Sequence, residues 1–176
     1  MSAPSIEQRL ERLESRIAIE ELLTRYALLL DDHRFDAVGE LFAADAVFGS
    51  PENLHHGRTA IVANYCAAAV LYPLSLHEAH GLVLDELADD HARGTVIGYS
   101  EQASDTATVV TSFRYADRYR YESGRWVFAA REVTTLYAMT HADRAAGGLS
   151  RPLRKRWPHR DPQPAHLPVH IDDRGR

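Results

Sequence analysis

Two histidines stand three positions apart in "YPLSLHEAHGLVLDE", residues 72–86, immediately before a stretch with strand character. Zinc sites of the H-E-x-x-H type need two imidazoles four positions apart on one helix face, so "HEAH" is one residue short. On a strand, His77 and His80 would point to opposite faces, and the adjacent His55 and His56 diverge in the same way. The spacing therefore predicts no metal site and leaves one histidine for other chemistry.

A carboxylate that could orient such a histidine is Asp31, directly after the apolar run "YALLL". Taken alone, Asp31 is a solvated acid like its neighbour Asp32, and His77 is a hydrogen-bonded residue at a strand edge. An acid at a helix C-terminus opposes the helix dipole, however, which indicates a specific partner. A carboxylate that accepts from one ring nitrogen leaves the other free as a base. Such a pair needs no metal or cofactor, and a well-placed base is worth about 10²–10⁴ in rate.

Arg131 is a further candidate, because it is predicted to share a strand face with Val127, Ala129 and Val133. An arginine among apolar neighbours either stabilises a leaving anion or enolate, or simply pairs with a nearby acid. The pattern leaves both alternatives open.

The elements that must position these residues follow from the spacing of apolar residues. Ser5 and Gln8 have the spacing of a capping box, which predicts a helix start. Apolar residues at helical spacing, with a stop before Pro73, predict helices over residues 5–30, 35–45 and 58–72.

From about residue 80 the apolar period changes to two, as is typical of strands. Strands are predicted over residues 81–88, 92–103, 107–121 and 125–140. Short turns between them favour antiparallel neighbours, so the chain is predicted to be α+β, with N-terminal helices packed on a curved sheet that encloses a pocket. Residues 1–140 would form the domain, and 141–176 an irregular tail rich in Pro, Arg and His.

Composition excludes several classes of function. The net charge is -5, although residues 151–176 carry seven Arg or Lys against three Asp, so the main body is acidic and unlike a nucleic-acid binder. The charged N-terminus and the absence of a long apolar run predict a cytoplasmic protein with no membrane contact. Cys66 is expected to be buried in a helix. The one lysine, Lys155, lies in the tail, which argues against Schiff-base chemistry.

The segments "IAIEELLTRYALLLDDHRFDAVGELFAADAVF", "HGRTAI" and "FRYADRYRYESGRWVFAAREV" resemble SnoaL-like proteins, within the nuclear transport factor two-like superfamily of cone-shaped α+β domains. The nearest likeness is to hexachlorocyclohexane dehydrochlorinase, scytalone dehydratase and bile-acid dehydratase. The resemblance implies an Asp–His dyad for elimination, with Asp31 as the aspartate. Between the two histidines we prefer His77, because Leu82 and Leu84 then stay in register and His80 packs or lines the rim. The family's common Asn four residues after the base is Gly81 here.

Other residues are assigned to the substrate pocket or to the core. Tyr26 takes the place of a pocket hydroxyl by resemblance and is otherwise a core aromatic. Tyr115 lies on one face of its strand with other aromatic residues, and Phe48 and Trp126 would form apolar walls.

The resulting hypothesis is a cofactor-independent lyase or isomerase for a small, largely apolar cyclic substrate, working as a homodimer or homotrimer. In this scheme His77 takes the proton, Asp31 orients it, and Arg131 or a tyrosine supports the departing group. One alternative is a non-catalytic ligand-binding or assembly subunit of the ring-hydroxylating dioxygenase type. Another is epoxide hydrolysis or polyketide cyclisation on the same scaffold, because one fold hosts many chemistries.

Overall fold

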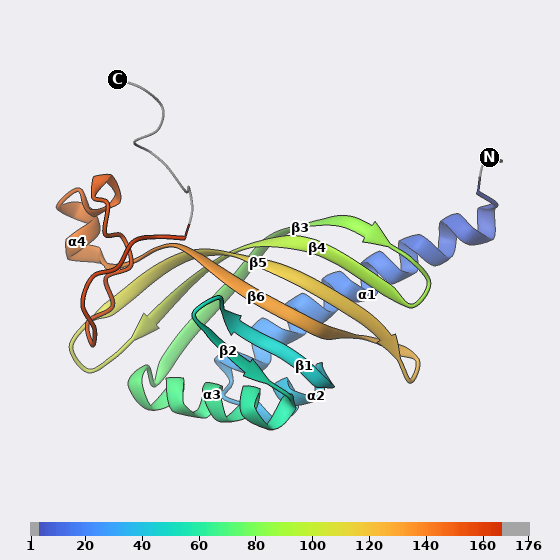
Figure 1. Ribbon diagram of the computed structural model, residues 1–176, viewed down its shortest axis with the longest axis horizontal. Coiled ribbons are helices and arrows are strands. Elements are labelled where there is room, and N and C mark those ends of the chain that lie inside the picture. Colours follow the sequence, from blue (N-terminus) through green and yellow to red (C-terminus); the bar gives the residue numbers. More distant parts are fainter. Residues whose placement is uncertain (1–3, 167–176) are drawn as a thin grey trace, which may run out of the picture.

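The computed structural model of the protein describes residues 4–166 (Figure 1). Its α-helices are α1 (Ile6–Asp31), α2 (Phe35–Glu40), α3 (Arg58–Leu71) and α4 (His141–Ala145), followed by a 3-10 turn at Gly148–Ser150. Its strands are β1 (Phe42–Ser50), β2 (Asn53–His56), β3 (Leu74–Leu87), β4 (His91–Ala103), β5 (Thr108–Glu122) and β6 (Arg125–Thr140).

The six strands form one curved sheet in the order β2-β1-β6-β5-β4-β3. All neighbours are antiparallel except β1 and β6, which run parallel. Helix α1 crosses the sheet beside β3, and α3 lies beside the β1–β2 hairpin (Figure 1). The predicted α+β class, with N-terminal helices on a curved sheet, is confirmed.

Helix α1 ends at Asp31 because a Schellman motif stops it there. His33 takes the left-handed conformation, with φ of 56°, and its N–H donates to the carbonyl of Leu30 at 3.0 Å. The N–H of Arg34 donates to the carbonyl of Leu29 at 2.9 Å, which completes the motif. Asp31 therefore occupies the last turn of α1, beside the start of β3.

The two halves of α1 differ in burial. The predicted capping box is present, because Ser5 Oγ accepts from the N–H of Gln8 and Gln8 Oε1 accepts from the N–H of Ser5. The N-terminal half extends past the strands (Figure 1), and its apolar stripe is exposed: Ile6, Leu10, Leu13 and Ile17. The C-terminal half is buried in the core through Ile19, Leu22, Leu23, Tyr26 and Leu30.

Three local predictions were wrong. The strand expected over residues 81–88 starts earlier, at Leu74, because β3 pairs with β4 from Leu74 to Leu87. The helix expected over residues 35–45 ends at Glu40, because Phe42 pairs with Phe128 of β6 at the start of the parallel strand β1. The core burial of Phe42, which is fully inaccessible to solvent, outweighs its helical spacing. Cys66 is exposed on α3 and not buried, because the buried face of this helix is made by Ile61 and Tyr65.

A register shift in β6 changes which residues share a face. Phe128 lies opposite Tyr119, and Arg131 lies opposite Asp117, although the two β6 residues are three positions apart. Partners across a ladder point to the same face, so a bulge inserts one residue between them. Arg131 therefore shares its face with Phe128 and not, as strict alternation predicted, with Val127.

Residues 141–166 contain α4, a 3-10 turn and irregular segments, and they contact the end of β6. The N–H of Ala138 donates to the carbonyl of Arg154 at 2.9 Å, and the N–H of Arg156 donates to the carbonyl of Ala138. Lys155 then forms a second bridge with Gln163. Through these two bridges the tail pairs with β6 and with itself. None of the helices within residues 4–166 is both long and apolar enough to cross a membrane.

Candidate active site

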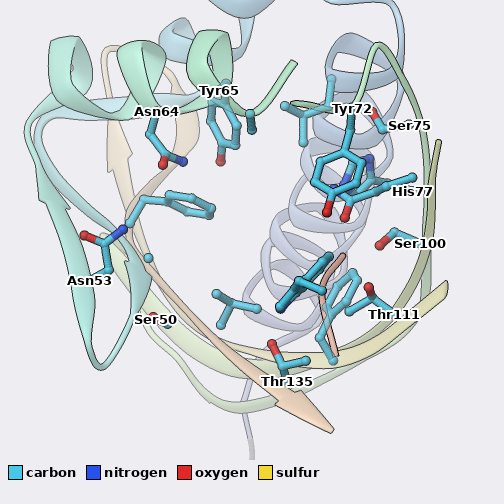
Figure 2. A pocket seen from close by; sticks show the side chains of 18 of the residues that line it. Ser50, Asn53, Asn64, Tyr65, Tyr72, Ser75, His77, Ser100, Thr111 and Thr135 are labelled. Atoms are coloured by element: carbon cyan, nitrogen blue, oxygen red, sulfur yellow. The ribbon is translucent and has the colours of Figure 1, made fainter. Parts of the chain in front are cut away.

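A cavity of about 740 Å³ lies between the curved sheet, α1, α3 and the tail (Figure 2). One part of its wall is apolar and aromatic: Tyr26, Leu30, Phe35, Phe48, Tyr65, Phe113, Tyr115, Val133 and Trp157. The polar part includes Ser50, Asn53, Asn64, Ser75, His77, Ser100, Thr111, Thr135, Lys155 and His166. A concave wall that combines aromatic side chains with polar groups can hold a small organic molecule.

His77 and Asp31 meet at this cavity. The Nδ1 atom of His77 lies 2.8 Å from Asp31 Oδ1, and the backbone N–H of His77 donates to Asp31 Oδ2 at 2.9 Å. Both carboxylate oxygens are thus bonded to one residue, which holds the imidazole in a single orientation. The side chains are 16% and 21% exposed, respectively, so the pair is largely withdrawn from bulk water.

The contact determines the tautomer of His77. A carboxylate only accepts hydrogen bonds, so Nδ1 carries the proton and Nε2 keeps its lone pair. Within residues 4–166, Nε2 makes no hydrogen bond. His77 lines the cavity and Asp31 lies behind it, so the basic nitrogen is the part of the pair available to a bound molecule.

Two tyrosines supply hydroxyl groups on another part of the wall. Tyr26 and Tyr65 lie with their hydroxyl oxygens 2.9 Å apart, and Figure 2 shows Tyr65 directed into the cavity. Burial raises the pKa of both hydroxyls well above the usual 10. Both groups therefore stay protonated at neutral pH and can donate hydrogen bonds. Phe48 and Tyr115 also line the cavity, as expected for pocket residues.

Arg131 lies beneath the cavity wall. Its Nε and Nη2 atoms donate to Asp117 Oδ1 and Oδ2 at 2.9 and 2.6 Å, and both side chains are almost fully buried. The guanidinium carbon is 4.4 Å from the ring centre of Tyr26 and 4.1 Å from that of Tyr115. Of the two roles left open by the sequence, the geometry matches the ion pair, because aromatic rings separate the charge from the cavity. Arg131 therefore packs against these rings and does not contact a leaving group.

Residues 11–132 match the family model of the SnoaL-like domain. The protein belongs to the SnoaL-like domain family. The match covers well over half of the chain and confirms the family inferred from the sequence segments. It ends within β6, so the last strand residues and the tail lie outside the matched part of the SnoaL-like domain.

Solved structures share the fold of this SnoaL-like protein. A candidate scytalone dehydratase from Novosphingobium aromaticivorans DSM 12444 is 19% identical, with a TM-score of 0.70 over 74% of this chain and 90% of that one. A hexachlorocyclohexane dehydrochlorinase from Novosphingobium barchaimii LL02 is 17% identical, with a TM-score of 0.70 over 76% of this chain and 94% of that one. These identities establish likeness of fold. No significant match was found among curated proteins.

Two predicted pocket residues of the SnoaL-like protein lie outside the cavity. His80 falls at a bulge in β3, half-exposed, with Nε2 3.6 Å from Glu78 Oε2. Trp126 lines a separate hollow beside the N-terminal half of α1, together with Tyr121 and Leu87. Strand periodicity placed both residues, but β3 and β6 contain bulges and β6 reaches well beyond the cavity. Within residues 4–166, no group of three or more His, Cys, Asp or Glu is arranged to hold a metal ion.

The sequence reasoning missed two sets of lining residues in the SnoaL-like protein. The first is a series of small hydroxyl side chains on the inner face of the sheet, labelled in Figure 2: Ser75, Ser100, Thr111 and Thr135. The second comes from the tail: Lys155, Trp157, Arg160, Gln163 and His166. The strand alternation around Ser100 could have indicated the first set. A tail that caps the pocket of its own or a neighbouring chain was considered from the sequence, but the spacing of its residues did not indicate which of them line the cavity.

Proposed function

We propose that the protein is a cofactor-independent lyase or isomerase that removes a proton from carbon with His77 as the base. The observation that carries this proposal is the two-point contact of Asp31 with the ring and backbone of His77 at the edge of a cavity with aromatic and polar walls. An enclosed base close to apolar walls suits a weakly acidic C–H group, because water competes poorly there.

In the proposed reaction, the lone pair of His77 Nε2 forms a new N–H bond with the substrate proton. The electron pair of the broken C–H bond becomes a carbon–carbon double bond, and a leaving group departs from the neighbouring carbon with its own bonding pair. In an isomerase the electron pair instead forms an enolate that is reprotonated elsewhere. The imidazolium that results is stabilised by the Asp31 carboxylate.

Hydroxyl donors lie on several sides of the base. Ser100 is the ladder partner of His77 on β4, and Thr111 is the next partner on β5. Tyr26 and Tyr65 provide the protonated pair on the other wall. A donor placed where negative charge develops lowers the barrier, so these groups are the candidates for stabilising an enolate or a departing oxygen.

Proton removal can be tested without knowing the natural substrate. Deuterium uptake at the α-carbon of 2-tetralone in D₂O, followed by NMR, reports C–H abstraction from a small bicyclic ketone. Chloride release from hexachlorocyclohexane, and enone absorbance from a cyclic β-hydroxyketone, report elimination. We expect the wild type to accelerate at least one reaction well above the His77→Ala variant. Equal rates for the two proteins across this panel would overturn the proposal.

A second candidate role, assembly, is favoured by the exposed stripe on α1. Ile6, Leu10, Leu13 and Ile17 are 70%, 55%, 57% and 62% exposed, and their spacing of four, three and four residues matches a coiled-coil seam. We propose that the stripe pairs with the same helix of a second copy of this chain.

Light scattering at micromolar concentration tests the pairing. The wild type is expected to be a dimer, and Leu13→Glu a monomer, because a charge in the seam loses its apolar contact. The matched control is Glu14→Gln, on an exposed position next to the stripe. A monomeric wild type contradicts self-association, and consistent co-purification with a larger iron–sulfur protein would favour the dioxygenase-subunit role instead.

A further inference from the structure

A row of ladder partners runs across the sheet from His77 to the tail. His77 pairs with Ser100, Ser100 with Thr111, and Thr111 with Ala138. Ala138 in turn bridges Lys155. Ladder partners point to the same face, and all members except Ala138 line the cavity. Figure 2 shows His77, Ser100 and Thr111 following one another along one wall.

The row of ladder partners places a base, two hydroxyl groups and a lysine in sequence across the sheet. It starts at a base, continues through two hydroxyls, and ends at the single lysine of the chain. Strands lie about 4.8 Å apart, so the four steps span at most about 19 Å along the backbone. The Thr111 hydroxyl is fully buried and has no hydrogen-bond partner within residues 4–166. This hydroxyl is therefore part of the wall between the base and the lysine and is not itself open to a bound molecule.

Lys155 and His166 form a pair of donors at the tail end of the row. The backbone N–H of Thr135 donates to His166 Nδ1 at 2.8 Å, so in the neutral ring Nε2 carries the proton. That nitrogen lies 2.9 Å from Glu52 Oε1 and 2.8 Å from Lys155 Nζ. An ammonium group has no acceptor. The single Nε2 proton of His166 is therefore donated to Glu52, and the Lys155 ammonium is a second donor beside it.

The Glu52 carboxylate only partly balances the positive charge of Lys155. Its Oε1 is 3.6 Å from Lys155 Nζ, and no other carboxylate in the described chain comes within 4.0 Å of the ammonium. The Glu52 side chain is 61% exposed, whereas that of Lys155 is 10% exposed. Both side chains line the cavity, but the ammonium is shielded while much of the Glu52 side chain is in solvent. A second carboxylate, entering from the cavity, would find the Lys155 ammonium within reach.

We propose that Lys155, held beside His166, forms a subsite for a carboxylate group on the substrate, at the opposite end of the cavity from His77. The substrate class is then an amphipathic cyclic acid, with an apolar ring body, an oxygen function beside Ser100, and an acidic substituent at the tail. This inference rests on the proposed function only for the position of the reacting carbon. The tail, beyond the matched domain, supplies the specificity.

Binding of a matched ligand pair tests the subsite. 2-Naphthoate and its neutral counterpart 2-naphthamide have the same ring body, and isothermal titration calorimetry measures both. A charge-assisted hydrogen bond contributes about 1.5–3 kcal/mol, so the wild type should prefer naphthoate by about 10- to 100-fold. Lys155→Met keeps the aliphatic stem and should abolish this preference. The matched control is Arg9→Met, which removes one exposed positive charge far from the cavity.

The ratio of the two affinities separates recognition from tail packing. A tail that merely loosens in Lys155→Met would weaken both ligands equally and leave the preference unchanged, and this result would overturn the proposal. Equal binding of the two ligands by the wild type would do the same. Glu52→Gln removes the internal carboxylate and should strengthen naphthoate alone; unchanged or weaker naphthoate binding contradicts the subsite. Because the readout is binding, these outcomes are independent of proton abstraction by His77.

Discussion

The cavity carries a carboxylate–imidazole pair at each end, and the two pairs are built differently. At one end Asp31 holds Nδ1 and the backbone N–H of His77, and Nε2 is left without a partner in the described chain. At the other end His166 uses both nitrogens: Nδ1 accepts from the backbone of Thr135, and Nε2 lies against Glu52. The same two chemical groups therefore produce one imidazole with an available lone pair and one without.

Burial separates the pairs further. The Asp31 side chain is 21% exposed and that of Glu52 is 61% exposed. A carboxylate shielded from water orients and stabilises its imidazole more strongly than one in solvent. A cation also lies beside His166 and none beside His77 in residues 4–166. A histidine–carboxylate contact therefore does not by itself make a general base. The imidazole can act as a base only if the nitrogen that does not face the carboxylate has a free lone pair.

The largest expected effect comes from removing the available lone pair. His77→Ala should lower the rate of α-proton exchange in 2-tetralone about 10³-fold, within the range for a general base. His166→Ala should lower it far less, through looser packing of the tail, and His80→Ala, outside the cavity, should leave it unchanged. NMR rates in D₂O measure all three. Equal losses for His77→Ala and His166→Ala would break the distinction between the two ends.

The fully buried ion pair of Asp117 with Arg131 tests how much a carboxylate contributes to stability when it is completely shielded from water. Asp117→Asn leaves the Arg131 charge unpaired under the cavity wall and should lower the free energy of unfolding by about 3–5 kcal/mol. The exposed pair of Asp45 with Arg120 provides the control, since Asp45→Asn should cost far less than Asp117→Asn. Urea denaturation measures both. A small loss for Asp117→Asn would mean that Arg131 finds another partner.

Asp31→Asn tests the contribution of the aspartate to the base. The amide oxygen can accept from only one of the two His77 N–H groups, because the amide NH2 is a donor. The amide also carries no charge to stabilise the imidazolium, so we expect kcat for proton exchange to fall about 10²-fold. The neighbouring Asp32→Asn changes charge equally at the helix end without contact with His77. Unchanged kcat in Asp31→Asn, with a fold intact by circular dichroism, would remove the aspartate from the mechanism.

The smallest expected effect concerns the pH dependence of the tail pair. Partial desolvation opposes ionisation of Glu52, but hydrogen bonds from its own backbone, Ser50 and His166 lower its pKa from 4.5 to about 2. A depressed pKa contributes stability above pH 4.5 that is lost as the pH falls towards 2. Glu52→Gln should therefore be less stable than wild type at neutral pH by under about 1 kcal/mol, because the pair is exposed.

Thermal unfolding from pH 6 to 2 checks this expectation. The melting temperatures of wild type and Glu52→Gln should converge as the pH drops from 4.5 to 2. A gap that stays constant over that range would show that the Glu52 charge does not hold the tail.

Much of the fold was predictable because it depends on local pattern. The capping box at Ser5, the helix ending near Leu71 and the period-two segments from residue 92 match the observed elements closely. The β5–β6 hairpin also follows local rules: Ser123 and Gly124 both take positive φ, as a two-residue turn requires. The start of β1 was not predictable, because Phe42 has helical spacing and only its pairing with β6 makes it a strand.

The candidate site also has features that the sequence predicted and features that only the structure revealed. The sequence by itself indicated that an acid ends the first helix at Asp31 and that a histidine, His77 in preference to His80, lies close to the first long strand of the sheet. Only the tertiary structure decided that Arg131 is enclosed, that Trp126 lies elsewhere, and that the tail returns to the cavity. Spacing specifies faces and ends of elements, which are properties of neighbouring residues. Bulges and contacts between distant segments depend on the energy of the whole assembled sheet, and no short stretch contains that information.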